Sequence, residues 1–280
     1  MTAPLARITS SSHEIPTARS RRREEADSSF SGLIHPPPHV GGYGTYEECG
    51  PARLRALLFV VLLAGNTQWA HAAPAQWIPL FPTNNDITTG WTVRAWNDVS
   101  KPGPTGALWR VTNAVLTGSA ERGSWLMSEQ EFADFVLEFD FKLGSNGNSG
   151  CALRAPMAGD PAFDGMELQM ADFRYNTNAS PSELTGGIYR AIPPEKQVYK
   201  PTEWNHYRII LRGPRLVAKL NGERIHDLDL STLAPEVKRH DGTLAPPVKD
   251  RPRRGHIGFQ NLSRGNDPVL IRNARLQVLE

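Results

Sequence analysis

The segment that most constrains the fold of this chain is residues 135–143, which read FVLEFDFKL. Every second residue in it is large and apolar, and three of the residues between them are charged. Successive side chains of a β-strand point to opposite faces, so this alternation predicts a strand with one face in a hydrophobic core. The apolar positions are Phe135, Leu137, Phe139, Phe141 and Leu143, and the charged positions are Glu138, Asp140 and Lys142.

Short runs of strand character, separated by turns, continue from Gln76 to the end of the chain. A tight hairpin is indicated at Asn221-Gly222, because this pair tolerates the positive φ of a type I′ turn. Short helical turns are expected at 129–133 and 230–234. About ten strands without a long amphipathic helix predict an all-β, two-sheet sandwich. The candidate strands are residues 107–111, 115–117, 124–128, 135–143, 151–154, 167–170, 207–212, 216–220, 256–260 and 269–279.

The segment GMELQMAD, residues 165–172, carries polar residues where a plain sandwich core would have none. Strict alternation places Glu167 and Gln169 on one face and Leu168 and Met170 on the other. A polar face above an apolar one is how a curved sheet builds a cleft over its core. The same pattern also fits an ordinary solvent-exposed face, since antiparallel sheets usually have one wet side.

Two other strands add polar residues to the predicted cleft. In NSGCALR, Arg154 shares a face with Ala152, and in RGHIGFQN, His256 and Gln260 alternate on one face with Gly258 between them. A glycine between two polar side chains leaves room for a ligand to approach the backbone. We therefore expect a cation, an imidazole and an amide beside the carboxylate; the alternative for His256 is a surface histidine.

Three further residues are candidates for contacting a ligand. Asp172 lies where its strand gives way to a loop, so it either reaches back to the cleft or caps its own backbone. Tyr189 and Trp204 are aromatic side chains that could stack on a sugar ring, with core packing as the alternative. The Pro- and charge-rich residues 234–254 are expected to form a long surface loop that borders the cleft.

The composition limits the classes of function. The chain has 280 residues and a formal net charge of +2, so nothing in its overall charge favours nucleic acid as a partner. A sandwich of about 200 residues is commonly one domain. The two cysteines, Cys49 and Cys151, are too few for a disulfide framework, and Cys151 is expected to be a small buried apolar side chain.

The first 72 residues read as a leader. Arg53 and Arg55 precede an apolar run at 56–65, and Ala70-His71-Ala72 follows, which together indicate a secretory signal peptide at 51–72. The apolar run is shorter than the ~20 residues that span a bilayer, so no membrane span is expected after processing. Residues 1–50 are expected to be disordered, or to lie before a mis-assigned start. The folded domain is then 73–280, in the periplasm or the medium.

Several motifs together resemble the 3-keto-disaccharide hydrolase family. The resemblance covers roughly Gln76 to Glu280, and its motifs are specific in combination and weak singly. They are WIPLF, SWLMSEQEFADFVLEFDFKL, NSGCALR, GMELQMAD, TGGIY, EWNHYRIIL, KLNGERI, RGHIGFQN and VLIRNARLQVL, in that order along the chain. The resemblance implies an antiparallel jelly roll of the concanavalin A and laminin G type.

The resemblance also implies a reaction. A sugar oxidised at C3 has an acidic C2 proton, and a base can remove it so that the glycosidic bond breaks by elimination and water adds to the product. Glu167 or His256 would be the base. Arg154, or a divalent cation held by Glu167 and His256, would stabilise the enolate. The ligand is expected to be a 3-keto-glycoside or other carbohydrate, oxidised beforehand by a partner glycoside 3-dehydrogenase.

The chain departs from the family pattern at one place. Asn261-Leu262 follows Gln260, where the family often has an Asp-His pair. Two other classes of function remain open, a non-catalytic carbohydrate-binding module and a structural laminin G-like adhesion domain, since one fold serves many functions. A catalytic site needs a titratable base and an enolate stabiliser, whereas a binding module can use aromatic rings and amides.

The leader makes a testable prediction. The exported protein should begin at Ala73, or within a residue or two of it, because the signal peptidase favours small residues such as Ala70 and Ala72. Intact mass and N-terminal sequencing of protein from the periplasm or medium would check this. Exported protein that retains residues before Arg53 would contradict the assignment.

Overall fold

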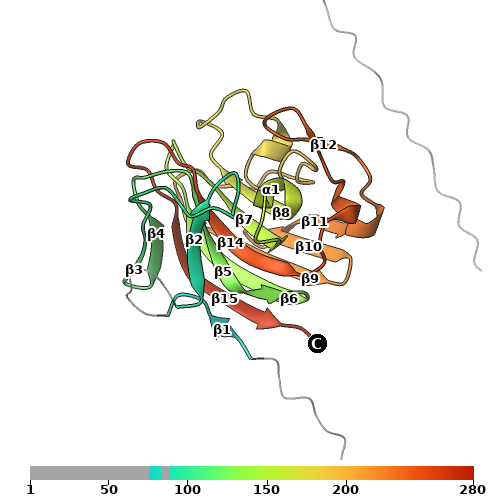
Figure 1. The fold of residues 1–280 in the computed structure, drawn as a ribbon, viewed down its shortest axis with the longest axis horizontal. Coiled ribbons are helices and arrows are strands. Elements are labelled where there is room, and N and C mark those ends of the chain that lie inside the picture. The colour runs from blue at the N-terminus through green and yellow to red at the C-terminus, as the bar shows by residue number, and fades with distance from the viewer. Residues whose placement is uncertain (1–75, 83–88) are drawn as a thin grey trace, which may run out of the picture. The chain divides into compact units, whose positions relative to one another are not determined.

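The computed structural model of this chain describes residues 76–82 and 89–280 (Figure 1). The predictions for the leader, residues 1–72, fall outside the described residues. Among the described residues no helix is long and apolar enough to cross a bilayer.

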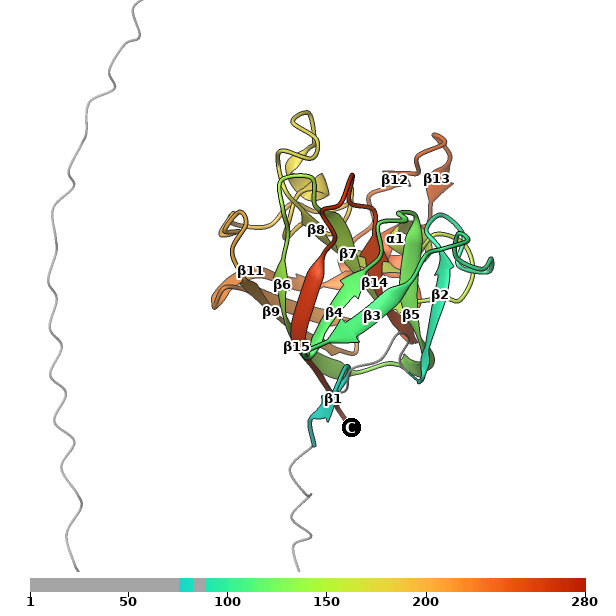
Figure 2. The same cartoon turned by 90° about the vertical axis from the view of Figure 1, so that its left-hand side faces the viewer.

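Two antiparallel sheets form the domain, as the sequence predicts. The large sheet has eight strands in the order β11-β10-β9-β6-β15-β4-β3, with β1 paired to β15. The five-stranded sheet has the order β2-β5-β14-β7-β8. The two sheets face each other across a hydrophobic core (Figures 1 and 2). The non-sequential strand order and the antiparallel pairing are those of an all-β jelly-roll sandwich of the concanavalin A type.

The large sheet consists of β1 (Ile78–Pro79), β3 (Trp109–Thr112), β4 (Val115–Gly118), β6 (Phe135–Lys142), β9 (Asn205–Arg212), β10 (Arg215–Leu220), β11 (Glu223–Asp229) and β15 (Leu270–Val278). The five-stranded sheet consists of β2 (Trp91–Ala95), β5 (Ser124–Phe132), β7 (Asn148–Ala155), β8 (Met166–Ala171) and β14 (Gly255–Asn261). The remaining elements are β12 (Val237–Lys238), β13 (Leu244–Ala245), the helix α1 (Pro161–Asp164), and the 3-10 turns η1 (Pro181–Glu183), η2 (Leu230–Thr232) and η3 (Val248–Asp250).

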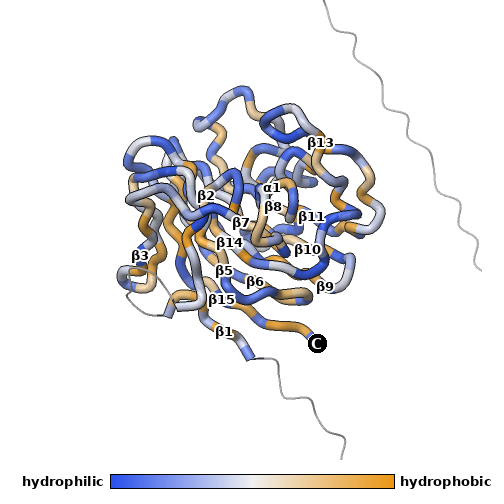
Figure 3. Tube along the Cα trace, viewed as in Figure 1, coloured by the Kyte–Doolittle hydropathy of each residue, from blue (hydrophilic) through white to orange (hydrophobic). Residues whose placement is uncertain are grey.

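The alternating strand at the centre of the large sheet supplies much of the core. All five predicted apolar side chains, from Phe135 to Leu143, are fully buried. The ring of Phe139 meets that of Phe259 on β14 edge to face, with centroids 5.2 Å apart, and so joins the two sheets. Figure 3 shows hydrophobic residues along the strands of both sheets and many hydrophilic residues in the surrounding loops.

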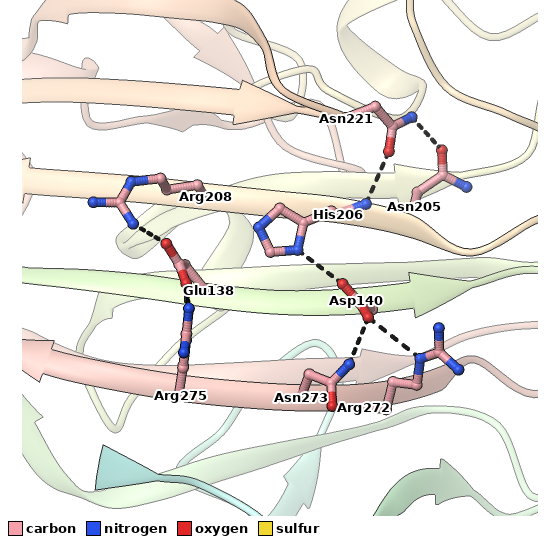
Figure 4. Close-up of polar contacts among 9 residues, drawn as sticks. All are labelled: Glu138, Asp140, Asn205, His206, Arg208, Asn221, Arg272, Asn273 and Arg275. Carbon is pink, nitrogen blue, oxygen red and sulfur yellow. Dashed lines mark hydrogen bonds and ion pairs between the residues drawn. The ribbon is translucent and has the colours of Figure 1, made fainter. Parts of the chain in front are cut away.

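The opposite face of β6 carries the predicted charges, and its two carboxylates are paired across neighbouring strands (Figure 4). Glu138 lies between Arg208 on β9 and Arg275 on β15. Asp140 accepts a hydrogen bond of 2.8 Å from Nδ1 of His206. Burial would raise the pKa of Asp140, but its hydrogen bonds from His206 and its other neighbours hold the pKa below the ordinary value. Such cross-strand pairs stabilise the outward face of the sheet.

The turn predictions had different outcomes. Asn221 and Gly222 adopt φ of 53° and 85° between β10 and β11, which confirms the predicted hairpin. Residues 230–232 form η2, also as expected. The helical turn expected at 129–133 is wrong: β5 continues to Phe132, because Glu131 and Phe132 pair with β14.

A bulge interrupts the regular pairing of β7 with β14. His256 pairs with Ala155, whereas Gly258 pairs with Ala152, so two residues of β7 are left opposite one residue of β14. Arg154, within this bulge, has a φ of +52°. A β-bulge re-aims the side chains that follow it, so alternation counted along the sequence fails on one side of this point.

Short elements surround one end of the five-stranded sheet. The helix α1 contacts β7 and β8, and the β12–β13 hairpin packs against α1 in a small hydrophobic cluster (Figure 2). Asp160 caps α1: its Oδ1 accepts a hydrogen bond of 3.0 Å from the backbone N–H of Ala162. Asp before Pro at the first helical position is a favourable start for even one helical turn.

The core makes a quantitative prediction. Phe139→Ala should lower the free energy of unfolding by about 3–5 kcal/mol, because it removes a large buried ring and leaves a cavity between the sheets. Lys219→Ala, at an exposed position of β10, should change it by less than about 0.5 kcal/mol. Urea unfolding of the two variants beside the parent would measure both. A loss below about 1 kcal/mol for Phe139→Ala would contradict the assigned packing.

Candidate active site

A cavity of about 390 Å³ lies against the five-stranded sheet, beside α1. Its floor comes from strands: Glu167 and Gln169 from β8, Asn148 from β7 and Gln260 from β14. Its walls come from loops and include Trp96, Arg122, Asp160, Glu183, Tyr189, Arg190 and His240. We call this cavity the pocket.

The alternation predicted for GMELQMAD is confirmed. Glu167 and Gln169 line the pocket, while Leu168 and Met170 are fully buried in the core on the other side of β8. Gly150, opposite on β7, makes room for the carboxyl group, since a Cβ atom there would collide with Oε1 of Glu167. The glycine in NSGCALR is therefore part of what shapes the pocket.

The environment of Glu167 favours the neutral, protonated form of its carboxyl group. Its side chain is only 2% exposed, and Oε1 has no hydrogen-bond partner among the described residues. Burial, together with the nearby charge of Asp160, raises the pKa of Glu167 well above its ordinary value. This shift favours the protonated carboxyl group, which can donate a hydrogen bond.

Asp160 is the second carboxyl group of the pocket, and sequence reasoning missed it. Burial raises the pKa of Asp160 from 3.8 to about 6, although its bond from the Ala162 N–H opposes the shift. A pKa of about 6 leaves Asp160 mostly ionised at pH 7, whereas the shift of Glu167 favours its neutral form. Two interacting carboxyl groups in opposite protonation states are the arrangement that separates an acid from a base. The Asp-Pro helix start was the available sequence signal for Asp160.

Aromatic and amide side chains complete the pocket. Tyr189 lines it, as predicted, and burial followed by the charge of Glu167 raises the pKa of its hydroxyl, which stays protonated. Gln260 lines it too, and Gln169 uses its Oε1 to accept a bond from the N–H of Met170. Planar amides beside aromatic rings suit a polyhydroxylated ligand. His240, from the predicted surface loop, confirms that this loop borders the pocket.

Arg154 does not face the pocket, so its predicted position is wrong. Its buried guanidinium donates to the carbonyl oxygens of Ala133 and Gly213 and forms an ion pair of 2.9 Å with Asp134. These partners lie in the turns at the far end of β5 and β9. The bulge turns Arg154 away from the face of Ala152, and the side chain fastens the two sheets together.

His256 is also placed elsewhere. Its Nδ1 donates a hydrogen bond of 2.7 Å to the carbonyl oxygen of Ser128, and its Nε2 lies 3.6 Å from Glu131. It does not line the pocket. A Cβ atom at Gly258 would collide with Met127, so this glycine serves packing against β5 and not the approach of a ligand. The same bulge separates His256 from Gln260.

The metal alternative is not supported by these positions. Glu167 and His256 were the candidate ligands, and their side chains contact different parts of the sheet. Among residues 76–82 and 89–280, no group of three or more His, Cys, Asp or Glu side chains is placed to hold a metal ion.

Asp172 and Trp204 differ in their relation to the pocket. Asp172 borders a second cavity, of about 50 Å³. This cavity adjoins the pocket, and Gln169 lines both. Burial would raise the pKa of Asp172, but hydrogen bonds from Arg174 and Tyr199 hold it below the ordinary value. Trp204 precedes β9 in the large sheet, where Arg272 stacks on its ring at 3.9 Å, and it does not line the pocket.

The departure from the family pattern falls on the pocket wall. Leu262 lines the pocket. Its carbonyl oxygen accepts two hydrogen bonds from Arg122, whose guanidinium also donates to the hydroxyl of Tyr175 at 2.9 Å. An apolar side chain beside an arginine thus stands at this part of the pocket wall.

The fold and the pocket together define a jelly-roll sandwich protein with an acid- and amide-lined pocket on one sheet. The chain belongs to the family of 3-keto-alpha-glucoside-1,2-lyase-like domains, which matches residues 76–277. This confirms the family and the fold expected from the motifs.

Solved structures agree with this assignment. A protein of Parabacteroides distasonis ATCC 8503, provisionally described as a glycosyl hydrolase, is 27% identical, with a TM-score of 0.59 over 73% of this chain and 100% of that chain. A second protein of that organism, described in the same way, is 22% identical, with a TM-score of 0.55 over 73% of this chain and 94% of its own, and shows the shared fold. A comparison with curated proteins found no match.

The raised pKa of Asp160 predicts how stability depends on pH. Between 3.8 and about 6 the folded protein holds a proton on Asp160 that the unfolded chain has lost. The parent therefore loses stability relative to Asp160→Asn as the pH rises through this window, and the difference stays constant above it. Asparagine is also a good helix cap, so α1 is preserved.

Urea unfolding of the parent and Asp160→Asn at pH 4, 5, 6 and 7 would measure this difference. A stability difference that does not change with pH would show that Asp160 has an ordinary pKa in the folded protein.

Proposed function

We propose that this protein cleaves 3-keto-glycosides by removing the C2 proton, eliminating the aglycone and hydrating the product. Family membership supports the substrate class. The observation that carries the mechanism is the pair of buried carboxyl groups in one pocket, where burial favours the neutral form of Glu167 and raises the pKa of Asp160 to about 6. Elimination next to a ketone needs one group that accepts a proton and another that stabilises negative charge.

The proposed reaction balances with one water molecule. The carboxylate of Asp160 takes the C2 proton, and the electron pair moves toward the C3 oxygen as an enolate. The pair then returns, the bond from C1 to the glycosidic oxygen breaks, and the aglycone leaves as an alcohol after accepting a proton. Water adds to the resulting enone, with hydroxyl at C1 and hydrogen at C2, and yields the free 3-keto-sugar.

Glu167 is proposed to donate a hydrogen bond to the enolate oxygen. A carboxylic acid kept neutral by an apolar site is an effective donor to an enolate, and its effect is strongest where water is excluded. The sequence suggested Glu167 or His256 as the base and Arg154 or a divalent cation as the enolate stabiliser. In this proposal Asp160 is the base and Glu167 is the stabiliser. Gln169, Gln260 and Asn148 on the pocket floor would orient the sugar hydroxyls.

The proposed substrate implies a preceding step and a place. A 3-keto-glycoside arises from oxidation of a glycoside at C3, so a glycoside 3-dehydrogenase would supply it. The leader would deliver the protein to the periplasm or the medium, where such sugars would be met.

The full-length protein should be incubated in D₂O with methyl 3-keto-glucoside and, separately, with unoxidised methyl glucoside. Methanol should be released from the keto-sugar alone, and the product should carry one deuterium at C2. Cleavage of both sugars at similar rates, without deuterium at C2, would indicate ordinary glycoside hydrolysis by the two carboxyl groups. Binding without cleavage would favour a carbohydrate-binding module.

Glu167→Gln gives the mutational prediction. The amide keeps the shape of the acid but is a weaker donor, so turnover of the 3-keto-glycoside should fall by about a hundredfold or more. The unfolding temperature should not fall, since the variant removes a buried carboxyl group. Steady-state kinetics and thermal unfolding of the same preparation would check both.

Leu168→Ala is the matched control on the next residue of β8. Its side chain is fully buried in the core, so the variant should lose about 2–5 kcal/mol of stability and keep its turnover in the folded fraction. Near-normal turnover in Glu167→Gln would place the reaction outside this pocket.

A further inference from the structure

Three aromatic side chains line one part of the pocket and form what we call the aromatic corner. They are Trp96, from the loop after β2, Tyr189, from the segment after η1, and His240, from the β12–β13 hairpin. Phe163 of α1 packs behind them and is buried. Four segments distant in sequence thus bring rings to one place.

The rings meet at large angles. The centroid of His240 lies 5.6 Å from that of Trp96 at an interplanar angle of 67°. It lies 5.3 Å from Phe163 at 85° and 5.9 Å from Tyr189 at 42°. His240 is exposed, and Trp96 and Tyr189 are half-buried, so ring surface remains available to a ligand. The corner has walls in several orientations and is not a flat platform.

The amides line the same pocket as the rings but also extend beyond it. Asn148, Gln169 and Asn176 line both the pocket and the adjoining cavity of about 50 Å³, whereas Trp96 and His240 line the pocket alone. The site therefore has an amide-lined recess that two of the three rings do not reach. Such a division suits a ligand with a hydroxylated part and an apolar planar part.

We propose that the aromatic corner is the aglycone subsite and that it selects 3-keto-glycosides with a planar aromatic aglycone. This inference rests on the proposed function. A planar ring can stack on one wall while it meets the edges of another, which are the geometries that aromatic pairs prefer.

The chemistry of the leaving group agrees with this choice. The hydroxyl of Tyr189 stays protonated, as its raised pKa indicates. Partial burial of the ring, followed by the positive charge of Arg190, lowers the pKa of His240. The negative charges of Glu183 and Asp241 oppose this shift. The corner thus offers neutral hydrogen-bond donors. These suffice for a phenolic oxygen, which is far less basic than the alkoxide of a sugar.

The hairpin that carries His240 is tied down on both sides. Arg239 forms an ion pair of 2.5 Å with Asp164 of α1. Arg190 donates a hydrogen bond of 3.4 Å to the carbonyl oxygen of Lys238. A corner already formed before binding orders fewer groups when the ligand arrives, which strengthens selection.

The test uses the full-length protein and two substrates of the same anomeric configuration, phenyl 3-keto-glucoside and methyl 3-keto-glucoside. The parent should favour the phenyl compound in kcat/KM. Trp96→Ala should lower the ratio of the phenyl to the methyl value by about tenfold or more, because it removes a stacking wall. Trp204→Ala, which removes a tryptophan from the large sheet, should leave the ratio unchanged.

His240→Ala, at an exposed position, gives the same measurement if Trp96→Ala fails to fold, and it should lower the ratio as well. Equal losses on both substrates would show that the corner holds the sugar ring and would overturn the inference. So would a parent that prefers a 3-keto-disaccharide to the phenyl compound.

Failure of the proposed function would be seen separately, as a parent that cleaves neither compound. Calorimetric binding of phenyl and methyl glucoside to the parent and Trp96→Ala then decides the inference. Preferential binding of the phenyl compound, lost in the variant, would support the corner, and equal binding would overturn it.

Discussion

The contact on which the rest of the structure depends is the packing of the two sheets through β6 and β14. Phe139 meets Phe259 edge to face, and Leu168 and Met170 of β8 join the same core. A slip of one residue would exchange every side chain of a strand between its two faces. By holding Leu168 inward, this packing fixes Glu167 on the opposite face, against the pocket.

Burying Glu167 is unfavourable for folding, since an unpaired buried acceptor and a carboxyl group out of water both cost free energy. Groups of this kind concentrate at functional sites, where an altered pKa is useful. The surrounding face shows a contrast: Trp125, Met127 and Ala152 form a second apolar cluster on the same sheet. On this sheet the pocket therefore lies beside an apolar cluster, against which Trp96 of the pocket wall packs.

Prediction from the sequence succeeded where alternation was uninterrupted. The core face of β6 and the two faces of β8 followed from spacing alone, because these strands are regular and each packs one face into the core between the sheets. It failed for Arg154 and His256, which lie at a bulge that no periodicity reveals. Arg154 adopts a positive φ there, and its side chain finds partners in two turns, Asp134 and Gly213, instead of the cleft.

The sequence by itself determined the sandwich, its hydrophobic faces, the family, and the position of Glu167 and Gln169, since period-two alternation is a local property of a strand. Only the tertiary structure decided which residues share the pocket with them. Asp160, Trp96 and His240 reach it from a helix cap, a loop and a hairpin far apart along the chain. Their meeting depends on how short segments fold over one end of a sheet, which long-range packing sets and local spacing does not encode.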